Sequence, residues 1–537
     1  MRKFLYTVIT LAILGFSSCN DFLEEEMRSQ KDGTKPFTSA ADGRAAVNAL
    51  YRQGFSGMWG AGSYTASRAM YDGYLSGLYE NVSYAGMNTF ITNALNLEVD
   101  SNVNDGDLRD YWSPLYVEIS RRANYAIKNL PTCPGLTDAE RARLLAEAKF
   151  FRGMNYFFLV KRFGPVPLID VQYTSLADDN FYPNRSSEKK IYDFIIKDLT
   201  EALNDGGLAD TAFPLNGMRV SKGSVLALLA DVSLNMGGYP LQDKSMYAKA
   251  AAYADQLIKD PAYALIESAD KAENSVYNVL RTSDVEKEYL YQIEYDGVIS
   301  DSGPYSAWCF PAETHKVFGL KYDIVNDCLT PIPTFLNVYD KTDDLRYQDG
   351  QYFHTEFKNR LTGEVIPLSV GRVKKYPFFF FEETAAVIDT KNTKDRVVYR
   401  LAEMYLIYAE ANTLATGNVS ALAISRLAKI QARASISKTQ ADIEARLATL
   451  SPDAFVKEVW KERMRELIFE NKTWMDVTRT RKYPLLDASA TAATFQFVDV
   501  IGARNGRGRT FTEKDLLLPY PNSEIQRNPN LMAEPLN

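Results

Sequence analysis

The chain has 537 residues, which is enough for one large domain or two of ordinary size. Its formal net charge of −7 argues against nucleic acid as a partner. Because its only histidines are His315 and His354, there is little room for a histidine metal site or a Ser-His-Asp triad, although carboxylate chemistry stays open.

The N-terminus has the pattern of an export signal that ends in a lipidated cysteine. Arg2 and Lys3 precede an apolar run, residues 4–16, that is well short of the roughly 20 residues a membrane-spanning helix needs. Small residues then lead directly to Cys19, as they do in bacterial lipoprotein precursors. We predict a signal peptide over 1–18, a lipid on Cys19, and a flexible, polar tether over 19–40.

Helical periodicity dominates residues 41–259. Ser187, Ser221 and Ser245 each precede a run with apolar residues at three- and four-residue spacing, and Gly-Gly pairs close the first two runs. The same spacing predicts helices over 112–123 and 144–158. This segment is therefore predicted to be a helical region.

Residues 260–397 have a different character. Gly, Pro and Asp become frequent, prolines break any long helix, and short β-like runs occur at 289–295 and 373–381. We predict an irregular insertion of loops and short strands on the helical scaffold, which is where binding residues tend to lie.

The helical pattern returns in residues 398–537. It predicts helices over 401–412, over 421–434, and from Ser451-Pro452 onward, with Pro at the first helical position. The predicted inner faces mix large aromatics with Ala, as in tetratricopeptide helix pairs, but no strict 34-residue repeat is visible. The expected fold is mainly α, with degenerate pairs of this type.

Several polar features favour no metal or cofactor. The loop 100–107 nearly follows an EF-hand opening, but its Gly falls one place late and Tyr111 stands where a bidentate Glu is needed. The basic loop 504–509 lacks Walker spacing and is predicted to be a solvated turn. Cys309 and Cys328 could pair, or remain free thiols like Cys133.

Four charged and aromatic motifs follow one another along the chain. They are E-A-K-F-F-R at 147–152 with its continuation to G-P-V-P-L at 164–168, R-L-A-E-M-Y-L-I-Y-A-E-A at 400–411, E-R-M-R-E-L-I-F-E with W-M-D at 462–476, and L-P-Y-P with E-I and N-P-N-L at 518–531. In content and order they resemble the SusD/RagB family of outer-membrane nutrient-binding lipoproteins. The resemblance spans roughly residues 45 to 537.

The resemblance implies an α-helical, non-catalytic protein at the cell surface. Its implied partner is a SusC-like TonB-dependent transporter, on which the lipoprotein sits as a lid. It also implies that the charged residues of the motifs, namely Glu147, Arg152, Arg400, Glu403 and Glu410, are scaffold ion pairs rather than catalytic groups.

A candidate ligand platform combines two aromatic segments. Sugars present CH faces that flat rings cover, and hydroxyl edges that Asn, Asp, Gln or Arg can bond. The Gly-broken window 51–90 interleaves such residues, and a second cluster lies in the insertion, although core packing or transporter contact explains any single ring equally well. The predicted ligand residues are Trp59, Tyr64, Arg68, Tyr71, Asp72, Tyr84, Asn88, Asn102, Tyr305, Trp308 and Phe310.

We therefore expect non-enzymatic capture of a nutrient, with an oligosaccharide or polysaccharide as the favoured cargo. Two alternatives stay open. The same fold could carry peptides, or the chain could be a helical glycoside hydrolase, which would need two carboxylates about 5 to 9.5 Å apart across a cleft.

Overall fold

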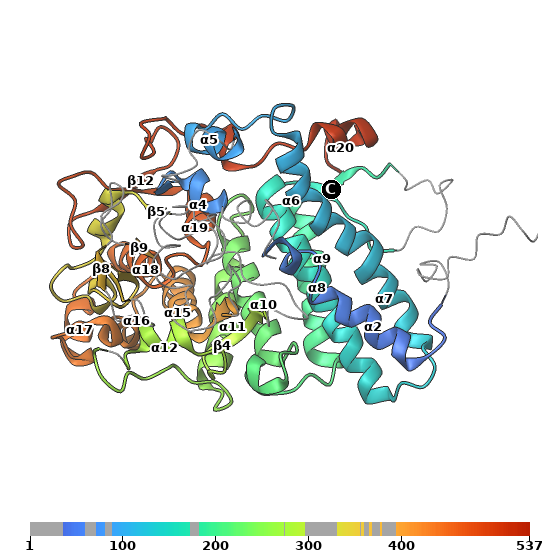
Figure 1. Ribbon diagram of the computed structural model, residues 1–537, viewed down its shortest axis with the longest axis horizontal. Helices are drawn as coiled ribbons and strands as arrows, with labels where there is room; N and C mark the ends of the chain where they lie inside the picture. Colours follow the sequence, from blue (N-terminus) through green and yellow to red (C-terminus); the bar gives the residue numbers. More distant parts are fainter. Residues whose placement is uncertain are drawn as a thin grey trace, which may run out of the picture.

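A computed structural model describes residues 36–59, 71–80, 89–171, 182–272, 274–295, 330–354, 356–358, 365–367, 376–377 and 394–537. These residues form a mainly α-helical body with short two-stranded sheets (Figure 1). The expected mainly α fold is confirmed.

The first described helix begins directly after a capping serine, Ser39. The Ser39 hydroxyl and the Asp42 carboxylate form a capping box, and Phe37 is already buried, with its ring edge-on to Tyr125 at 5.1 Å. The chain thus enters the core before residue 40, where the predicted tether ended. The elements are α2 (Ala40–Leu50), η2 (Ser56–Trp59), α4 (Tyr71–Ser76), α5 (Thr89–Asn96), α6 (Asp105–Val117), a π-helical turn η3 (Glu118–Ala123), α7 (Asn124–Asn129), η4 (Leu130–Thr132) and α8 (Asp138–Phe163).

The next helices largely begin where the sequence predicts. The elements are α9 (Glu188–Asp205), η5 (Phe213–Asn216), α10 (Lys222–Gly237), α11 (Ser245–Lys259) and α12 (Val276–Thr282). Ser187 caps α9 by accepting the Lys190 N–H, and Ser221 caps α10. Ser245 is different: it is the first helical residue of α11, and its hydroxyl donates to Asp243 at 2.6 Å.

The C-terminal helices follow one buried strand. The elements are β10 (Arg396–Arg400), α15 (Leu401–Thr416), α16 (Ala421–Ala434), α17 (Gln440–Leu447), α18 (Pro452–Glu466), α19 (Thr473–Thr480), η8 (Glu513–Leu516), α20 (Asn522–Arg527) and η9 (Pro529–Met532). Ser451 caps α18 with Pro at its first position, as predicted. The short helix α17 was not predicted, although Thr439 and Asp442 give it a capping box.

The sheets are antiparallel pairs that join distant segments. The strands are β1 (Tyr79–Glu80), β2 (Val166–Pro167), β3 (Arg185–Ser186), β4 (Tyr289–Ile293), β5 (Thr330–Pro331), β6 (Phe353–His354), β7 (Glu356–Lys358), β8 (Val365–Pro367), β9 (Tyr376–Pro377), β11 (Lys482–Leu485) and β12 (Gln496–Asp499), besides β10. They pair as β1-β5, β2-β3, β4-β10, β6-β9, β7-β8 and β11-β12, and two 3-10 turns, η6 (Pro333–Val338) and η7 (Leu345–Tyr347), follow β5. Of the predicted β-like run 373–381, the described part is β9.

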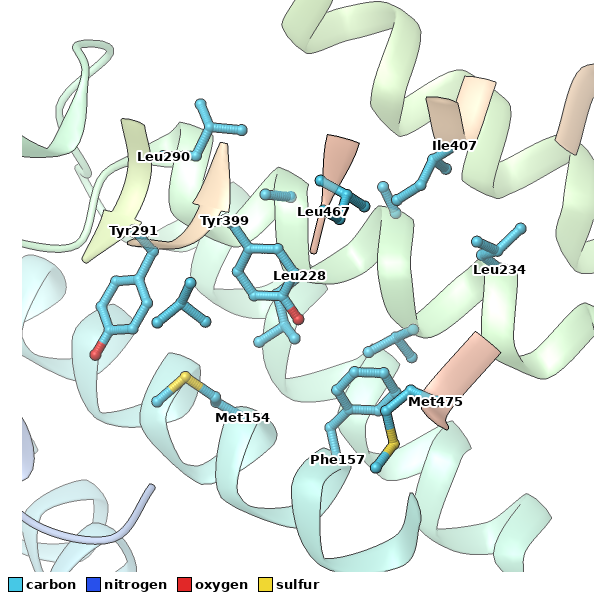
Figure 2. Close-up of a cluster of buried hydrophobic side chains, with 14 of the residues drawn as sticks. Met154, Phe157, Leu228, Leu234, Leu290, Tyr291, Tyr399, Ile407, Leu467 and Met475 are labelled. Atoms are coloured by element: carbon cyan, nitrogen blue, oxygen red, sulfur yellow. The ribbon is translucent and has the colours of Figure 1, made fainter. Parts of the chain in front are cut away.

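The core lies where α8, α10 and α15 meet the β4–β10 pair. Figure 2 shows Met154 and Phe157 of α8 facing Leu228 of α10, with Tyr291 of β4 and Tyr399 of β10 beside them. All five side chains are almost fully buried. The helices follow one another across the body from α8 and α9 through α10 and α11 to α15 and α16, while α4 and α5 from the N-terminal part lie near α19 (Figure 1).

Candidate functional site

Trp59, Tyr295, Asp395 and Arg396 form a buried cluster, called here the anchor cluster. The Tyr295 hydroxyl donates to the Trp59 carbonyl at 2.8 Å, and the Tyr295 N–H donates to Asp395 Oδ1 at 2.8 Å. The Arg396 guanidinium lies over the Trp59 ring, 3.4 Å from its centroid. Residues 59, 295 and 394–396 are the described residues next to the ranges 60–70, 296–329 and 378–393. The described residues that border these three ranges therefore lie together.

A strand pair brings two further segment ends together. Tyr79 pairs with Pro331, and Glu80 pairs with Thr330, in the β1–β5 ladder. The Ile332 N–H extends this contact by donating to the Leu78 carbonyl at 3.0 Å. β1 precedes residues 81–88 and β5 follows 296–329. Described residues of the N-terminal aromatic window and of the insertion therefore lie next to each other.

Burial perturbs the charged groups of the anchor cluster. It raises the pKa of the Asp395 carboxyl to about 7, and the nearby Asp284 carboxylate raises it further. Burial also lowers the pKa of the Arg396 guanidinium to about 10. The cluster therefore holds one side chain, Asp395, that titrates close to neutral pH.

Two predicted ligand residues have interior positions. The Trp59 side chain is 1% exposed beneath Arg396. Asp72 is 2% exposed and pairs with the buried Arg162, and burial outweighs this partner and raises the pKa of Asp72. Since neither side chain presents surface to a ligand, the binding platform proposed below does not include them.

The other predicted ligand residues are placed as follows. Asn102 is exposed, in a turn where the Asp100 carboxylate accepts the backbone N–H groups of Asn102 at 2.8 Å and Val103 at 3.1 Å. Tyr71 is the first residue of α4, but its side chain is outside the described part. Also outside the described residues are Cys19, Cys309, Cys328, Tyr64, Arg68, Tyr84, Asn88, Tyr305, Trp308 and Phe310.

Several aromatic residues of the window 51–90 belong to the core. Tyr74, Tyr79 and Phe90 are buried, and two parts of the window form the helices α4 and α5, although its spacing indicated neither helix nor strand. For these three rings the packing interpretation is confirmed. No local sequence signal indicates the anchor cluster, because Tyr295 and Arg396 contact Trp59 only through the tertiary fold.

The two loops considered for metal or phosphate have structural roles. The Asn104 side chain accepts the Asp100 N–H at 3.0 Å, directly before α6 begins at Asp105. Among the described residues, no group of three His, Cys, Asp or Glu side chains is arranged to hold a metal ion. The basic loop 504–509 is exposed apart from Asn505, whose side-chain amide is buried and donates to the Leu95 carbonyl at 2.8 Å.

The carboxylates of the sequence motifs are ion-paired, as predicted. Arg152 makes two bonds of 2.7 Å to Asp198. Glu403 pairs with Arg463 at 3.2 Å. Other pairs of this kind are Glu147 with Arg143 and Arg219, Glu410 with Arg479, and Arg400 with Glu288, Glu466 and Glu470. These side chains hold helices and strands together, and the scaffold interpretation is confirmed.

A polar cavity of about 300 Å³ lies between η7, α16, α17 and α18. Its polar side chains bond one another: Arg446 donates to Gln431 Oε1 at 2.7 Å, Gln431 donates to Glu458 at 3.0 Å, and Arg465 donates to Glu462 at 2.8 Å. Since these groups already satisfy each other, the cavity offers a ligand few hydrogen-bonding groups.

Comparison with known proteins places this fold in one family. The SusD family model matches residues 369–536, and a model described as "Starch-binding associating with outer membrane" matches residues 21–234. The chain belongs to the SusD/RagB family. In the described residues, no helix is long and apolar enough to cross a membrane.

Relatives match along almost the whole chain. A SusD-like protein P2 from Formosa agariphila is 26% identical over 553 residues, covering 99% of each chain. A SusD superfamily crystal structure from Parabacteroides distasonis is 28% identical, with a TM-score of 0.75 over 92% of this chain and 98% of that one. Surface glycan-binding protein A from Bacteroides thetaiotaomicron, solved with laminarihexaose, shares the fold at 17% identity, with a TM-score of 0.66 over 91% of this chain and 98% of that one.

Proposed function

We propose that this chain is a cell-surface lipoprotein of the outer membrane that binds an oligosaccharide or polysaccharide without transforming it. Membership of the SusD/RagB family carries the proposal. The fold is shared with a protein whose structure contains laminarihexaose and with one described as a laminarin-binding SusD-like protein. These ligands are properties of those proteins, and they make glycans the first cargo to test here.

We propose that the ligand platform combines two segments whose described residues contact each other. The anchor cluster and the β1–β5 ladder bring the described ends of the N-terminal window and of the insertion together. This supports a joint platform from Tyr64, Arg68, Tyr71, Tyr84, Asn88 and Asn102 on one side and Tyr305, Trp308 and Phe310 on the other.

Binding to a glycan panel tests the cargo and the platform together. Affinity electrophoresis or calorimetry with the full chain is expected to find a glycan ligand. Trp308→Ala is expected to weaken binding at least tenfold, because the stacking of the indole ring on a CH face of the sugar is lost. Tyr239→Ala removes a 40%-exposed ring that lies beside Arg481 and serves as the control. Equal binding by Trp308→Ala and the parent protein would remove Trp308 from the platform.

Lack of catalysis is proposed because the motif carboxylates are occupied. Glu147, Glu403 and Glu410 each pair with arginine, which leaves them poorly suited to act as the acid and base of a glycoside hydrolase. Incubation of the purified protein with each glycan that it binds is expected to release no product. Release from any of them would overturn the non-enzymatic proposal, and binding of peptides alone would favour the alternative cargo.

A lipid at Cys19 and a SusC-like TonB-dependent transporter complete the proposal. Two or more acyl chains make membrane attachment effectively permanent, since each buried CH₂ contributes about 0.8 kcal/mol. Cys19→Ala is expected to release the protein from the membrane fraction. The parent protein is expected to copurify with a transporter from detergent-solubilised outer membranes, and its isolation alone under gentle conditions would contradict the partnership.

A further inference from the structure

An apolar cavity of about 410 Å³ lies beside the closing L-P-Y-P motif. Its walls include Leu75, Leu97, Val99, Phe163, Leu518 and Tyr520. This is the size and lining typical of small-molecule sites, which have mostly apolar walls and a few placed polar groups. The motif fixes one wall, because the Leu518 N–H donates to the Arg162 carbonyl at 2.6 Å.

Tyr520 and Arg185 form the polar corner of the cavity. The Tyr520 hydroxyl donates to the Pro165 carbonyl at 2.5 Å and accepts from Arg185 Nη1 at 3.0 Å. The Arg185 guanidinium also lies 5.3 Å from the Tyr520 ring centroid. The Tyr520 hydroxyl holds the Arg185 guanidinium at the cavity wall.

The charges that line the cavity are mainly positive. Lys514 is exposed and, within the described part of the chain, makes no ion pair. Asp515 also lines the cavity, but its carboxylate accepts the Thr512 N–H and hydroxyl, each at 2.7 Å, at the start of η8. The neighbouring Glu513 is paired with Arg481 at 2.6 Å. Arg185 and Lys514 are therefore the charges available to a ligand.

We propose that this cavity is a second ligand site, which binds a small apolar molecule carrying one carboxylate. The apolar body, an alkyl chain or an aromatic ring, lies against Leu97, Val99 and Phe163. The carboxylate lies near Arg185 and Lys514, where Coulomb attraction stabilises it. The Arg185 Nε and Nη2 groups already donate to the Ala533 carbonyl, and Nη1 donates to Tyr520, so Arg185 acts mainly through its charge. This site is separate from the anchor cluster and does not depend on the glycan proposal.

Calorimetry with octanoate and with 4-hydroxycinnamate tests the site and separates the two sources of apolar body. At least one of these carboxylates is expected to bind the full chain, and octanamide, which lacks the charge, is expected to bind more weakly than octanoate. Lys514→Gln is expected to weaken carboxylate binding about threefold, as for a partly exposed charge pair. Val99→Phe fills the cavity and is expected to weaken binding more than tenfold.

Lys249→Gln, which removes an exposed lysine from α11, is the matched control and is expected to leave binding unchanged. If Val99→Phe lowers the melting temperature, Leu517→Trp replaces it, because Leu517 lies at the cavity and is 41% exposed. The proposal is overturned if neither carboxylate binds at millimolar concentration, or if the folded cavity-filling variant binds both as the parent protein does.

Discussion

The two halves of the helical body differ in how their buried charges are arranged. The N-terminal half holds separate pairs, such as Arg152–Asp198 and Asp72–Arg162, whereas the C-terminal half joins several charges in one network. In the N-terminal half, α10 is buried along its whole length, and its Val, Leu and Ala side chains pack between α9, α11 and the β4 strand. In the C-terminal half, a buried network joins Arg346, Arg400 and Arg433 to Glu288 and Glu466. Apolar packing tolerates many partners of similar size, whereas a buried charge requires a matching one.

The charged network therefore selects which segments meet. Its members come from η7, β10, α16, α18 and the residue before β4, which are far apart in the sequence. Burial alone would raise the pKa of Glu466, but Arg433, Arg400 and Arg346 outweigh it and lower that pKa to about 2. We infer that the network fixes how the insertion and the C-terminal helices dock, while apolar burial supplies most of the stability.

The sharpest test of this contrast is Glu466→Gln. The variant leaves three buried arginines short of a counter-charge, and breaking a buried pair in this way costs about 3 to 5 kcal/mol. Urea unfolding at neutral pH should show this loss of free energy. Glu267→Gln, at a carboxylate whose side chain is 72% exposed and pairs with Lys429, is the control and is expected to change stability by less than about 0.5 kcal/mol. A loss at Glu466 no larger than this would show that the network contributes little to the free energy of unfolding.

In the N-terminal half, the corresponding change is Leu228→Ala. Leu228 is fully buried among Met154, Tyr291 and Tyr399 (Figure 2). Leaving a cavity there is expected to destabilise the fold by about 2 to 4 kcal/mol. Because no charge is involved, the loss should be the same at low and high salt. Leu422→Ala, at a leucine 43% exposed on α16, should be nearly neutral.

The anchor cluster gives a pH-dependent test. The folded-state pKa of Asp395 is raised to about 7, whereas the unfolded value is about 3.9. The stabilisation from its protonated form is thus complete below pH 4 and is lost as the pH rises through about 7. Asp395→Asn keeps an oxygen that can accept the Tyr295 N–H. Relative to the parent protein, the variant should gain on the order of 2 kcal/mol between pH 4 and pH 8.

Chemical denaturation of both proteins at several pH values measures this difference. Glu118, whose pKa burial also raises to about 7, titrates in both proteins, so only the difference between their curves reports on Asp395. Parallel stability curves from pH 4 to pH 8 would show that Asp395 is not perturbed as described.

Local signals in the sequence predict the helices well, but they do not predict contacts between residues that are far apart in the chain. Ser187 and Ser451 mark helix starts because capping depends on residues within one turn. The pairing of motif carboxylates with arginines also follows from the charge pattern. Which partner each one meets does not, since Arg346 reaches Glu466 only in the folded chain. The sequence pattern predicts Trp59 at a ligand surface because nothing local indicates that Arg396 covers it.

The smallest expected effect concerns a surface ion pair in the N-terminal half. Arg44 of α2 makes two bonds, 2.6 and 3.0 Å long, to the Glu140 carboxylate of α8. The Arg44 side chain is 52% exposed, so solvent screens the pair, and its coupling energy is expected to be far smaller than the loss at Glu466. A double-mutant cycle with Arg44→Ala and Glu140→Ala measures this coupling, which should fall further in 1 M salt, where the Debye length is about 3 Å. A coupling as large as the loss at Glu466 would contradict this expectation, because a solvent-screened pair would then contribute as much as the buried network of the C-terminal half.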